Sequence, residues 1–307
     1  MKLRFALGVF LISLLQKEPL TPLRVFGNTT TIELSPVLVA ANGIYPGPVT
    51  VSNGGIPNIV NGTADIATNA ETQMLRASVD DPSLRVIMTV AESYYRIVAR
   101  KSSGIAKVAD LKGKRITTPR NTSAAYFLSK MLATANLTDA DITFVATPAT
   151  GMAAALKDRQ VDAVAMWEPE AERAIEAVGD DAIVLQDRKV YRELFNLNTS
   201  TKVLADPAKR RAIVEFVRTL ITTSERLRTR PQEHWPYISM KLNYPQELVV
   251  KCWPELSFAG SMVSDLLDVM EQEEPWVAKE RDRTPRTRAQ LATLIDDSVL
   301  KEALAGR

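Results

Sequence analysis

Short apolar segments typical of β-strands alternate with helical segments through the first two thirds of the chain, and this alternation starts a second time near its middle. The first series runs from the strand predicted at 23–27 to the one at 84–90. The second series runs from the strand predicted at 113–119 to the one at 182–185. Alternating strands and helices are typical of parallel sheets covered by helices. The sequence therefore predicts two successive α/β units.

Beyond Lys189 the pattern becomes helical, with Ile213, Val217 and Leu220 on one face of a helix predicted at 207–228. We expect no further series of strands there, so these helices should pack on the first unit. The predicted first lobe is 21–97 with 191–307, and the predicted second lobe is 98–190. Two crossings, near 96–101 and 187–193, would join them.

The N-terminus has the form of a secretory signal, because the basic residues Lys2 and Arg4 precede an uncharged run over 5–15. This run is too short to span a bilayer as a helix. The segment predicts a signal peptide over 1–20 and a periplasmic or secreted location, although it lacks a small-residue cleavage site. A hydrophobic N-terminal strand is the alternative. No other segment approaches transmembrane length, so we expect no stable membrane insertion.

Composition excludes several function classes. The chain has one cysteine, Cys252, and one histidine, His234, so an intrachain disulfide and a Cys/His zinc site are excluded. Neither residue has a neighbour in the sequence that would make it a catalytic nucleophile or base. A net charge of +2, with acids interleaved among the basic runs, argues against nucleic-acid binding. We predict no metal and no cofactor.

Three segments carry a family resemblance: VADLKGKRITTP at 108–119, NTSAAYFL at 121–128 and AAALKDRQVDAVAMWEP at 153–169. Together they resemble the second lobe of the sulfonate-, taurine- and thiamine-precursor-binding family of ABC-transporter solute-binding proteins. The segment 56–67 resembles the first lobe more weakly. The resemblance implies an α/β, two-lobed periplasmic binding protein type II fold with an interlobe cleft and C-terminal helices. It also implies a non-catalytic clamp that closes on a small polar molecule.

Candidate binding residues follow the predicted strand ends, where ligands sit in open α/β sheets. The helix start at 121–123 offers free backbone N–H groups to a polar ligand, although simple N-capping is the structural alternative. The resemblance implies that Trp167 stacks on the ligand and that Glu168 binds a donor on it, with a Trp packed at a hinge as the alternative. The predicted binding set is Asn28, Thr29, Thr30, Asn69, Glu71, Tyr94, Asn121, Thr122, Ser123, Trp167 and Glu168.

Other functions remain as alternatives. The resembling family includes a fungal pyrimidine synthase that uses a cysteine-rich motif and histidines around iron, and this chain lacks both. A carboxylate-based activity at Glu71 or Glu168 has no paired acid motif to support it. Glycosylation sequons at five positions favour a secreted eukaryotic binder as a further alternative: Asn28, Asn61, Asn121, Asn136 and Asn198.

Partners follow from the binding function. The ligand is expected to be a sulfonate, a pyrimidine or an amino-acid-like compound. In a bacterial setting an ABC permease would be the partner of a monomeric binder.

Overall fold

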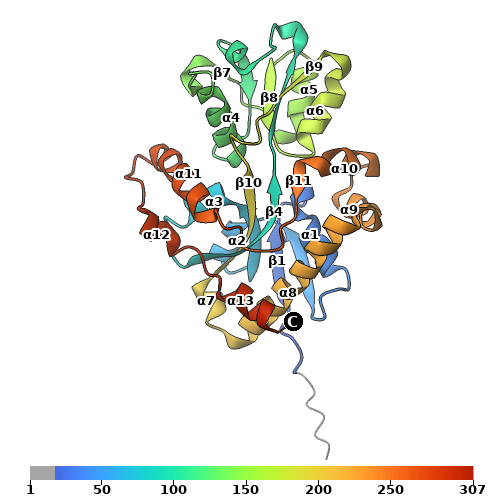
Figure 1. The fold of residues 1–307 in the computed structure, drawn as a ribbon, viewed down its shortest axis with the longest axis vertical. Helices are drawn as coiled ribbons and strands as arrows, with labels where there is room; N and C mark the ends of the chain where they lie inside the picture. The colour runs from blue at the N-terminus through green and yellow to red at the C-terminus, as the bar shows by residue number, and fades with distance from the viewer. Residues whose placement is uncertain (1–17, 307) are drawn as a thin grey trace, which may run out of the picture.

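A computed structural model describes residues 18–306, so the predicted signal segment lies outside the described residues except for its last three positions. The chain folds into two lobes, one above the other in Figure 1, each built on its own β-sheet. The predicted two α/β units are therefore present.

The six-stranded sheet of the first lobe has the order β11-β4-β10-β3-β1-β2. Strands β1, β2 and β3 are parallel to each other, whereas β10 is antiparallel to both β3 and β4. The bounds are β1 Leu23–Gly27, β2 Val49–Asn53, β3 Ile66–Ala70, β4 Leu84–Ser93, β10 Glu193–Ser200 and β11 Leu256–Ser257.

Beyond Lys189 the described chain forms no third sheet, as expected, but two strands that were not predicted join the first sheet, and β10 lies in its middle. All eight residues of β10 are buried, and two of them are asparagines. The Asn196 amide donates to Leu194 O, and the Asn198 amide donates to Ala67 O and Asn196 O. These bonds satisfy the buried amide N–H groups close to two register shifts in the β10–β4 ladder, and Thr89 Oγ1 donates to Asn196 Oδ1. Tertiary hydrogen bonds thus make a polar sequence acceptable in a central strand.

The five-stranded sheet of the second lobe has the order β7-β6-β8-β5-β9. Strand β5 is antiparallel to β8 and β9, whereas β6 is parallel to β7 and β8. The bounds are β5 Arg96–Arg100, β6 Arg115–Thr117, β7 Thr143–Phe144, β8 Ala163–Met166 and β9 Ala182–Leu185. Both sheets are therefore mixed: the parallel pairs expected from the alternation are present, and antiparallel strands join them.

Two crossings connect the lobes. The first is very short, because β4 ends at Ser93 and β5 begins at Arg96. The expected crossing near 96–101 is instead β5 itself, which pairs with β8 from Arg96 onward. The second crossing lies between Leu185 and Glu193, near the predicted range.

Helices cover both sheets, and the later ones pack on the first lobe (Figure 1). In the first lobe the helices are α1 Ser35–Ala41, α2 Ile56–Val60, α3 Glu71–Ala77, α7 Thr201–Leu204, α8 Pro207–Thr229, α9 Trp235–Leu242, α10 Gln246–Cys252, α11 Leu266–Glu280, α12 Arg288–Ala292 and α13 Ser298–Ala305. In the second lobe they are α4 Ser123–Ala133, α5 Met152–Lys157 and α6 Glu170–Val178. Helix α8 turns Ile213, Val217 and Leu220 into the main core, as its periodicity predicts.

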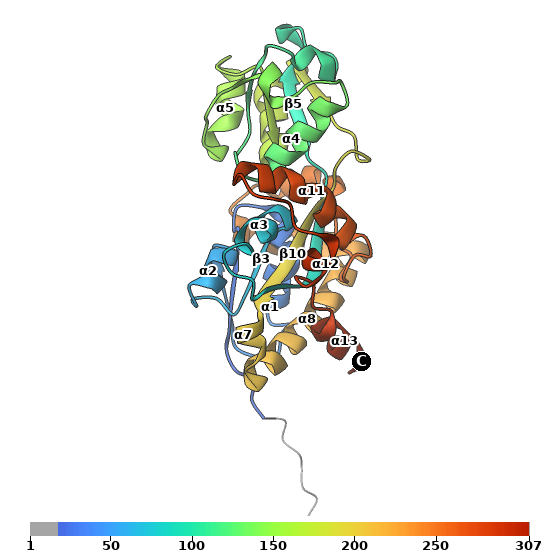
Figure 2. The ribbon, with the colours of Figure 1, turned by 90° about the vertical axis from the view of Figure 1, so that its left-hand side faces the viewer.

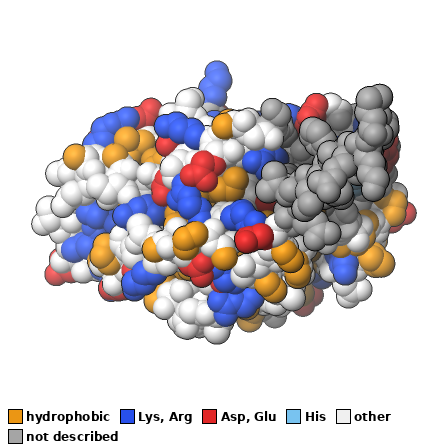
Figure 3. Space-filling model, turned by 90° about the horizontal axis from the view of Figure 1, so that it is seen from below, with side chains coloured by type: hydrophobic (Ala, Val, Ile, Leu, Met, Phe, Trp, Pro, Cys, Tyr) orange, Lys and Arg blue, Asp and Glu red, His pale blue; other side chains and the backbone are white. Residues whose placement is uncertain are grey.

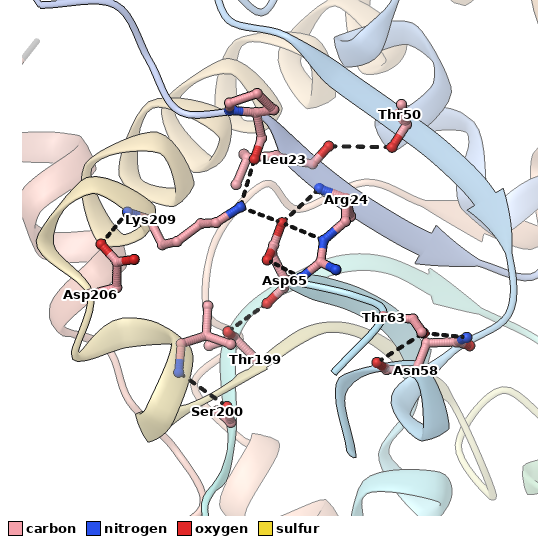
Figure 4. A network of polar contacts seen from close by, with 12 residues as sticks. Leu23, Arg24, Thr50, Asn58, Thr63, Asp65, Thr199, Ser200, Asp206 and Lys209 are labelled. Atoms are coloured by element: carbon pink, nitrogen blue, oxygen red, sulfur yellow. Dashed lines mark hydrogen bonds and ion pairs between the residues drawn. The ribbon is translucent and has the colours of Figure 1, made fainter. Parts of the chain in front are cut away.

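A buried carboxylate fastens β1, β3 and α8 together (Figure 4). Asp65 accepts hydrogen bonds from the backbone N–H and the guanidinium of Arg24 and from Lys209 Nζ, at 2.8–3.3 Å. Burial acts to raise the pKa of Asp65, but these bonds hold it below its usual range. Asp65 is therefore a structural carboxylate, and the first lobe balances its charge with two cations.

The outer surface mixes both charge signs. Lys and Arg side chains alternate with Asp and Glu side chains on the lower face of the first lobe (Figure 3). Within residues 18–306, no helix combines the length and the apolar character that crossing a membrane requires.

Candidate functional site

The facing surfaces of the two lobes touch, and we call this contact region the seam. Thr31 Oγ1, which follows β1, donates to the backbone oxygen of Glu168 at 3.2 Å. On one side of the seam, Tyr126 OH of α4 donates to Gln272 O of α11 at 3.2 Å, and these two helices lie against each other (Figure 2). On the other side, Lys251 of α10 pairs with Glu176 of α6 at 2.5 Å. The lobes are thus in a closed arrangement.

Four glutamates of the first lobe bring their carboxyl groups together at the seam. They come from a 3₁₀ turn after β1, the start of α3, the start of β10 and the middle of α11, and each is at most 3% exposed: Glu33, Glu71, Glu193 and Glu273. We call these residues the acid cluster. Only Glu71 belongs to the binding set predicted from the sequence.

The acid cluster consists of two carboxyl pairs. The carboxyl of Glu33 is close enough to that of Glu193 for the two to share a proton in a hydrogen bond. The carboxyls of Glu71 and Glu273 form a second pair of this kind. Glu71 also accepts hydrogen bonds from Tyr191 OH at 2.6 Å and from the backbone N–H of Leu194 at 2.8 Å. Glu33 accepts one from Thr31 Oγ1 at 2.6 Å. The cluster therefore has some neutral donors, but its carboxyls mainly face each other.

Burial raises the pKa of all four carboxyls, because a charged carboxylate loses its hydration there. The charges of Glu33 and Glu71 raise the pKa of Glu193 further. The charge of Glu71 does the same for Glu273. In this closed arrangement the cluster cannot be fully ionised without a compensating positive charge.

Aromatic rings adjoin the acid cluster. Tyr95, in the first crossing, lies with its ring centroid 6.0 Å from that of Trp167 and 5.6 Å from that of Tyr191. Tyr191 in turn meets Tyr126 edge to face at 5.5 Å. The Tyr95 hydroxyl lies 2.9 Å from Ser123 Oγ, so it joins the hinge to the start of α4. The seam thus combines carboxyl groups with rings from both lobes.

Glu168 is a fifth buried carboxyl, but it has a cationic partner. Arg96 Nε donates to Glu168 Oε1 at 2.7 Å, and Arg96 Nη2 donates to Glu172 Oε2 at 2.9 Å. Burial raises the pKa of Glu168 to about 7 in spite of Arg96. Cys252 Sγ donates to its other oxygen at 3.4 Å, and burial raises the pKa of this thiol. Glu168 is therefore held by internal partners, although the resemblance implies a ligand contact.

The residues predicted from the first lobe lie at several different depths. Glu71 is in the acid cluster, and Tyr94 lies at the hinge with the guanidinium of Arg188 4.5 Å from its ring centroid. Asn69 is half-buried and accepts a hydrogen bond from the backbone N–H of Ile56. The loop 28–30 follows β1, and its side chains bond mainly within the lobe: Asn28, Thr29 and Thr30.

Of the residues predicted from the second lobe, Asn121 contacts the first lobe and Ser123 contacts Tyr95 of the first crossing. Asn121 is exposed with φ 61°, and its backbone oxygen accepts from Gln73 Nε2 of the first lobe at 2.9 Å. Thr122 precedes α4, and its hydroxyl donates to Pro119 O instead of capping the helix. Ser123 is buried against Tyr95, whereas Trp167 is half-buried between two clusters of the lobe core. A route from solvent to Trp167 therefore exists.

A groove of about 480 Å³ runs along the edge of the seam between α4 and α11. Its second-lobe wall includes Thr118, Asn121 and Phe144, and its first-lobe wall includes Trp276 and Lys279. A volume in this range is typical of small-molecule sites. The loop at 121–123, identified from the sequence, therefore borders open space between the lobes.

The acid cluster predicts an unusual pH dependence of stability for ligand-free protein. A buried carboxyl with a raised pKa contributes most to stability below its ordinary pKa of 4.5, and this contribution is lost as the pH rises through its pKa in the folded protein. Glu168, which lies outside the acid cluster, behaves in the same way and has a pKa of about 7 in the folded protein. We expect the melting temperature to be about 3–6 °C higher at about pH 5 than at about pH 8. Scanning calorimetry on dialysed protein measures this difference. A melting temperature that falls from pH 8 to pH 5 would contradict the prediction.

Metal ligation and cysteine–histidine chemistry have no support among the described residues. Across 18–306, no three His, Cys, Asp or Glu side chains are arranged to hold a metal ion. His234, whose pKa burial lowers, precedes α9 in the first lobe, and the hydrogen bond of Cys252 goes to Glu168. The seam therefore presents charge, rings and hydroxyls rather than an activated nucleophile.

Comparison with known proteins supports this reading of the fold. A family model described as NMT1/THI5 like matches residues 48–232. The alkanesulfonate-binding protein SsuA from Xanthomonas axonopodis bound to MOPS is 20% identical, with a TM-score of 0.70 over 91% of this chain and 99% of that one. The aliphatic sulphonate-binding protein SsuA from Escherichia coli is 16% identical, with a TM-score of 0.72 over 88% and 91%.

An enzyme shares the architecture as well. A desulfurization enzyme in complex with biphenyl-2-sulfinic acid is 15% identical, with a TM-score of 0.67 over 93% of this chain and 99% of that one. No curated protein sequence matches the chain. At these identities the likeness shows the fold, and the predicted two-lobed periplasmic binding protein fold is confirmed.

Proposed function

The chain belongs to the NMT1/THI5-like family, and on this basis we propose that it is an extracytoplasmic solute-binding protein that captures a small molecule between its lobes by hinge closure. The observation that carries the proposal is the seam itself. Strand ends and helix starts of both lobes meet there around two short crossings, so a ligand touching both lobes would favour the closed state.

The hinge region supports movement of the lobes as bodies. Each sheet is complete on its own side of the crossings, and no strand pairs across the boundary among the described residues. The polar contacts across the seam are mostly single hydrogen bonds and one ion pair, including Gln73 to Asn121 O and Lys251 to Glu176, and the rings of Tyr126 and Trp276 also meet there at 5.4 Å. Such contacts are individually weak, so opening requires little rearrangement inside either lobe.

Binding is favoured over turnover because, among residues 18–306, the buried thiol at the seam is not paired with a base that would activate it. Cys252 is buried with a raised pKa, and its hydrogen-bond partner is a carboxyl of raised pKa. In a bacterial setting the partner would be an ABC permease and the binder a periplasmic monomer. The secreted eukaryotic alternative loses one of its sequons, because Asn198 is fully buried in β10 and its amide is hydrogen-bonded there.

Native mass spectrometry of the purified full chain tests the function directly. We expect a small molecule to co-purify, and we expect its mass to stay unchanged over hours of incubation with the protein. Conversion of the bound molecule by the wild-type chain would overturn the binding function in favour of an enzyme.

Substitution Trp167→Ala tests the assignment of the site. We expect affinity for the co-purified molecule to fall by about 1–3 kcal/mol, because an aromatic anchor contributes both contact area and stacking. Calorimetry measures the loss, with Trp235→Ala in α9 as a matched control that should bind normally. Unchanged affinity in the Trp167 variant would remove this residue from the site.

A further inference from the structure

We propose that the seam binds the positively charged group of a small organic cation, such as a primary amine or an amidine, with the acid cluster as its counter-charge. This inference rests on the proposed function and specifies its ligand class. Of the three expected ligand classes, a sulfonate, a pyrimidine or an amino-acid-like compound, it departs from the sulfonate.

Among the described residues, the carboxyl groups of the acid cluster have no ion pair to balance their charge. None of the four carboxyls of the acid cluster has an ion pair with Lys or Arg among residues 18–306. Elsewhere the chain supplies cations to carboxylates that are equally buried. Glu168 is paired with Arg96, and Glu274, the neighbour of Glu273 in α11, is paired with Arg283 and Arg286. The acid cluster is thus the exception in a chain that otherwise balances its buried carboxylates.

Several acceptor atoms of the acid cluster face only other carboxyl groups. Glu33 Oε1, Glu193 Oε2 and both carboxyl oxygens of Glu273 are buried, and among the described residues they have no hydrogen-bond donor unless one carboxyl of each pair carries a proton. Buried polar atoms in folded proteins are nearly always hydrogen-bonded, and an unpaired carboxyl oxygen costs more than an unpaired neutral group. An ammonium or amidinium group carries several N–H donors and a positive charge. It would therefore satisfy both the unused acceptors and the charge.

A cavity lies at the Glu273 end of the acid cluster. Glu273 lines a cavity of about 200 Å³ together with Tyr126 and Tyr191. Two arginines of the same cavity are already paired, Arg188 with Glu255 and Arg192 with Glu92 and Asp265. Lys130 and Lys189 also line it, and Lys130 weakly favours the charged form of Glu273. The cavity therefore gives a small molecule a place beside an unpaired carboxyl.

Aromatic rings line this cavity and adjoin the acid cluster. Tyr126 and Tyr191 form walls of that cavity, and Tyr95 and Trp167 continue the ring cluster toward Ser123. The electron-rich faces of tyrosine and tryptophan attract organic cations, and the attraction increases when water is excluded. Carboxyls and aromatic rings together are a combination that selects cations.

An anion fits the acid cluster poorly, although Lys130 and Lys189 in the adjoining cavity would attract one there. The Arg96 guanidinium, which lies at the hinge, is already engaged by Glu168 and Glu172. A sulfonate placed among the four carboxyls would add a like charge in a region from which water is excluded. A metal ion fits poorly as well, since the described carboxyls are not arranged as a set of metal ligands. These contrasts leave an organic cation as the matching chemistry.

The test compares ligands of equal chain length on the full-length protein. Butylamine and putrescine are titrated by calorimetry against butane-1-sulfonate, each at about pH 7.5, where both amines are charged. We expect both amines to bind, putrescine at least as tightly as butylamine, and the sulfonate not to bind. Glu193→Gln and Glu273→Gln should each weaken amine binding by at least about tenfold, because each removes one charge partner in a buried site. The control Glu302→Gln, on the exposed face of α13, should bind normally.

Three results would contradict the proposed cation site, and they differ in what they say about the proposed function. Binding of the sulfonate without binding of the amines overturns the cation assignment and leaves the solute-binding function intact. Amine binding that persists unchanged in both glutamine variants overturns the placement at the acid cluster. If no compound binds and native mass spectrometry finds no ligand, the inference and the proposed function fail together.

Discussion

Replacing Arg96 with Met is expected to lower the free energy of unfolding by about 3–5 kcal/mol at about pH 8, because it leaves the Glu168 carboxylate buried without its cation. Glu168 is completely buried, and Arg96 contacts it at 2.7 Å. The loss should shrink at about pH 5, since Glu168, with a pKa of about 7, is then neutral in the folded protein. Urea unfolding at the two pH values measures both effects.

The control for this experiment is Arg115→Met. Arg115 pairs with Asp162 at 2.9 Å, but its side chain is 44% exposed, so its loss should cost less than about 1 kcal/mol. If Arg96→Met destabilises the protein equally at both pH values, the effect comes from lost packing and the electrostatic account is wrong.

Substitution Glu193→Gln is expected to raise the free energy of unfolding of the ligand-free protein by about 1–3 kcal/mol at about pH 8, because it removes a buried carboxyl that folding must either keep ionised without a cation or protonate. The glutamine amide is neutral, and it can donate a hydrogen bond toward Glu33, whose Oε1 has no partner. The gain should vanish at about pH 4.5, because Glu193 of the wild type is then protonated in the folded state.

The matched control is Glu247→Gln at the exposed start of α10, which should change stability by no more than about 0.5 kcal/mol. A Glu193→Gln variant that is less stable than the wild type at pH 8 would show that the carboxyl has a structural partner. Such a result would also weaken the case for a missing cation. A variant that is more stable yet binds amines less well would show that stability is sacrificed at this position for function.

Much of the second lobe could be predicted from the sequence. The stripe formed by Phe127, Leu128, Met131 and Leu132 predicts a helix, and α4 buries all four residues. The polar triplet before it predicts a helix start facing the first lobe, and the structure places Ser123 against Tyr95. Local periodicity and turn chemistry are sufficient here because the helix and its start are determined within a few residues.

The acid cluster could not be predicted, since its four glutamates come from distant parts of the chain. Glu33 follows a strand, Glu273 lies within a helix rich in acids, and Glu193 begins a strand that the sequence pattern did not reveal. A glutamate in any of these settings is ordinarily a solvated surface residue. The single member that was predicted, Glu71, was recognised by its place after β3 and not by any partner.

The sequence by itself determined which segments become strands and helices in most of the chain, and where the alternation begins again, because these depend on side chains a few residues apart. Only the tertiary structure decided that β10 would return to the centre of the first sheet and bring Glu193 opposite Glu33. It likewise decided that Arg96 would pair with Glu168 and leave the acid cluster without a cation. Burial and charge pairing depend on which segments meet in space, and that meeting is a property of the folded chain alone.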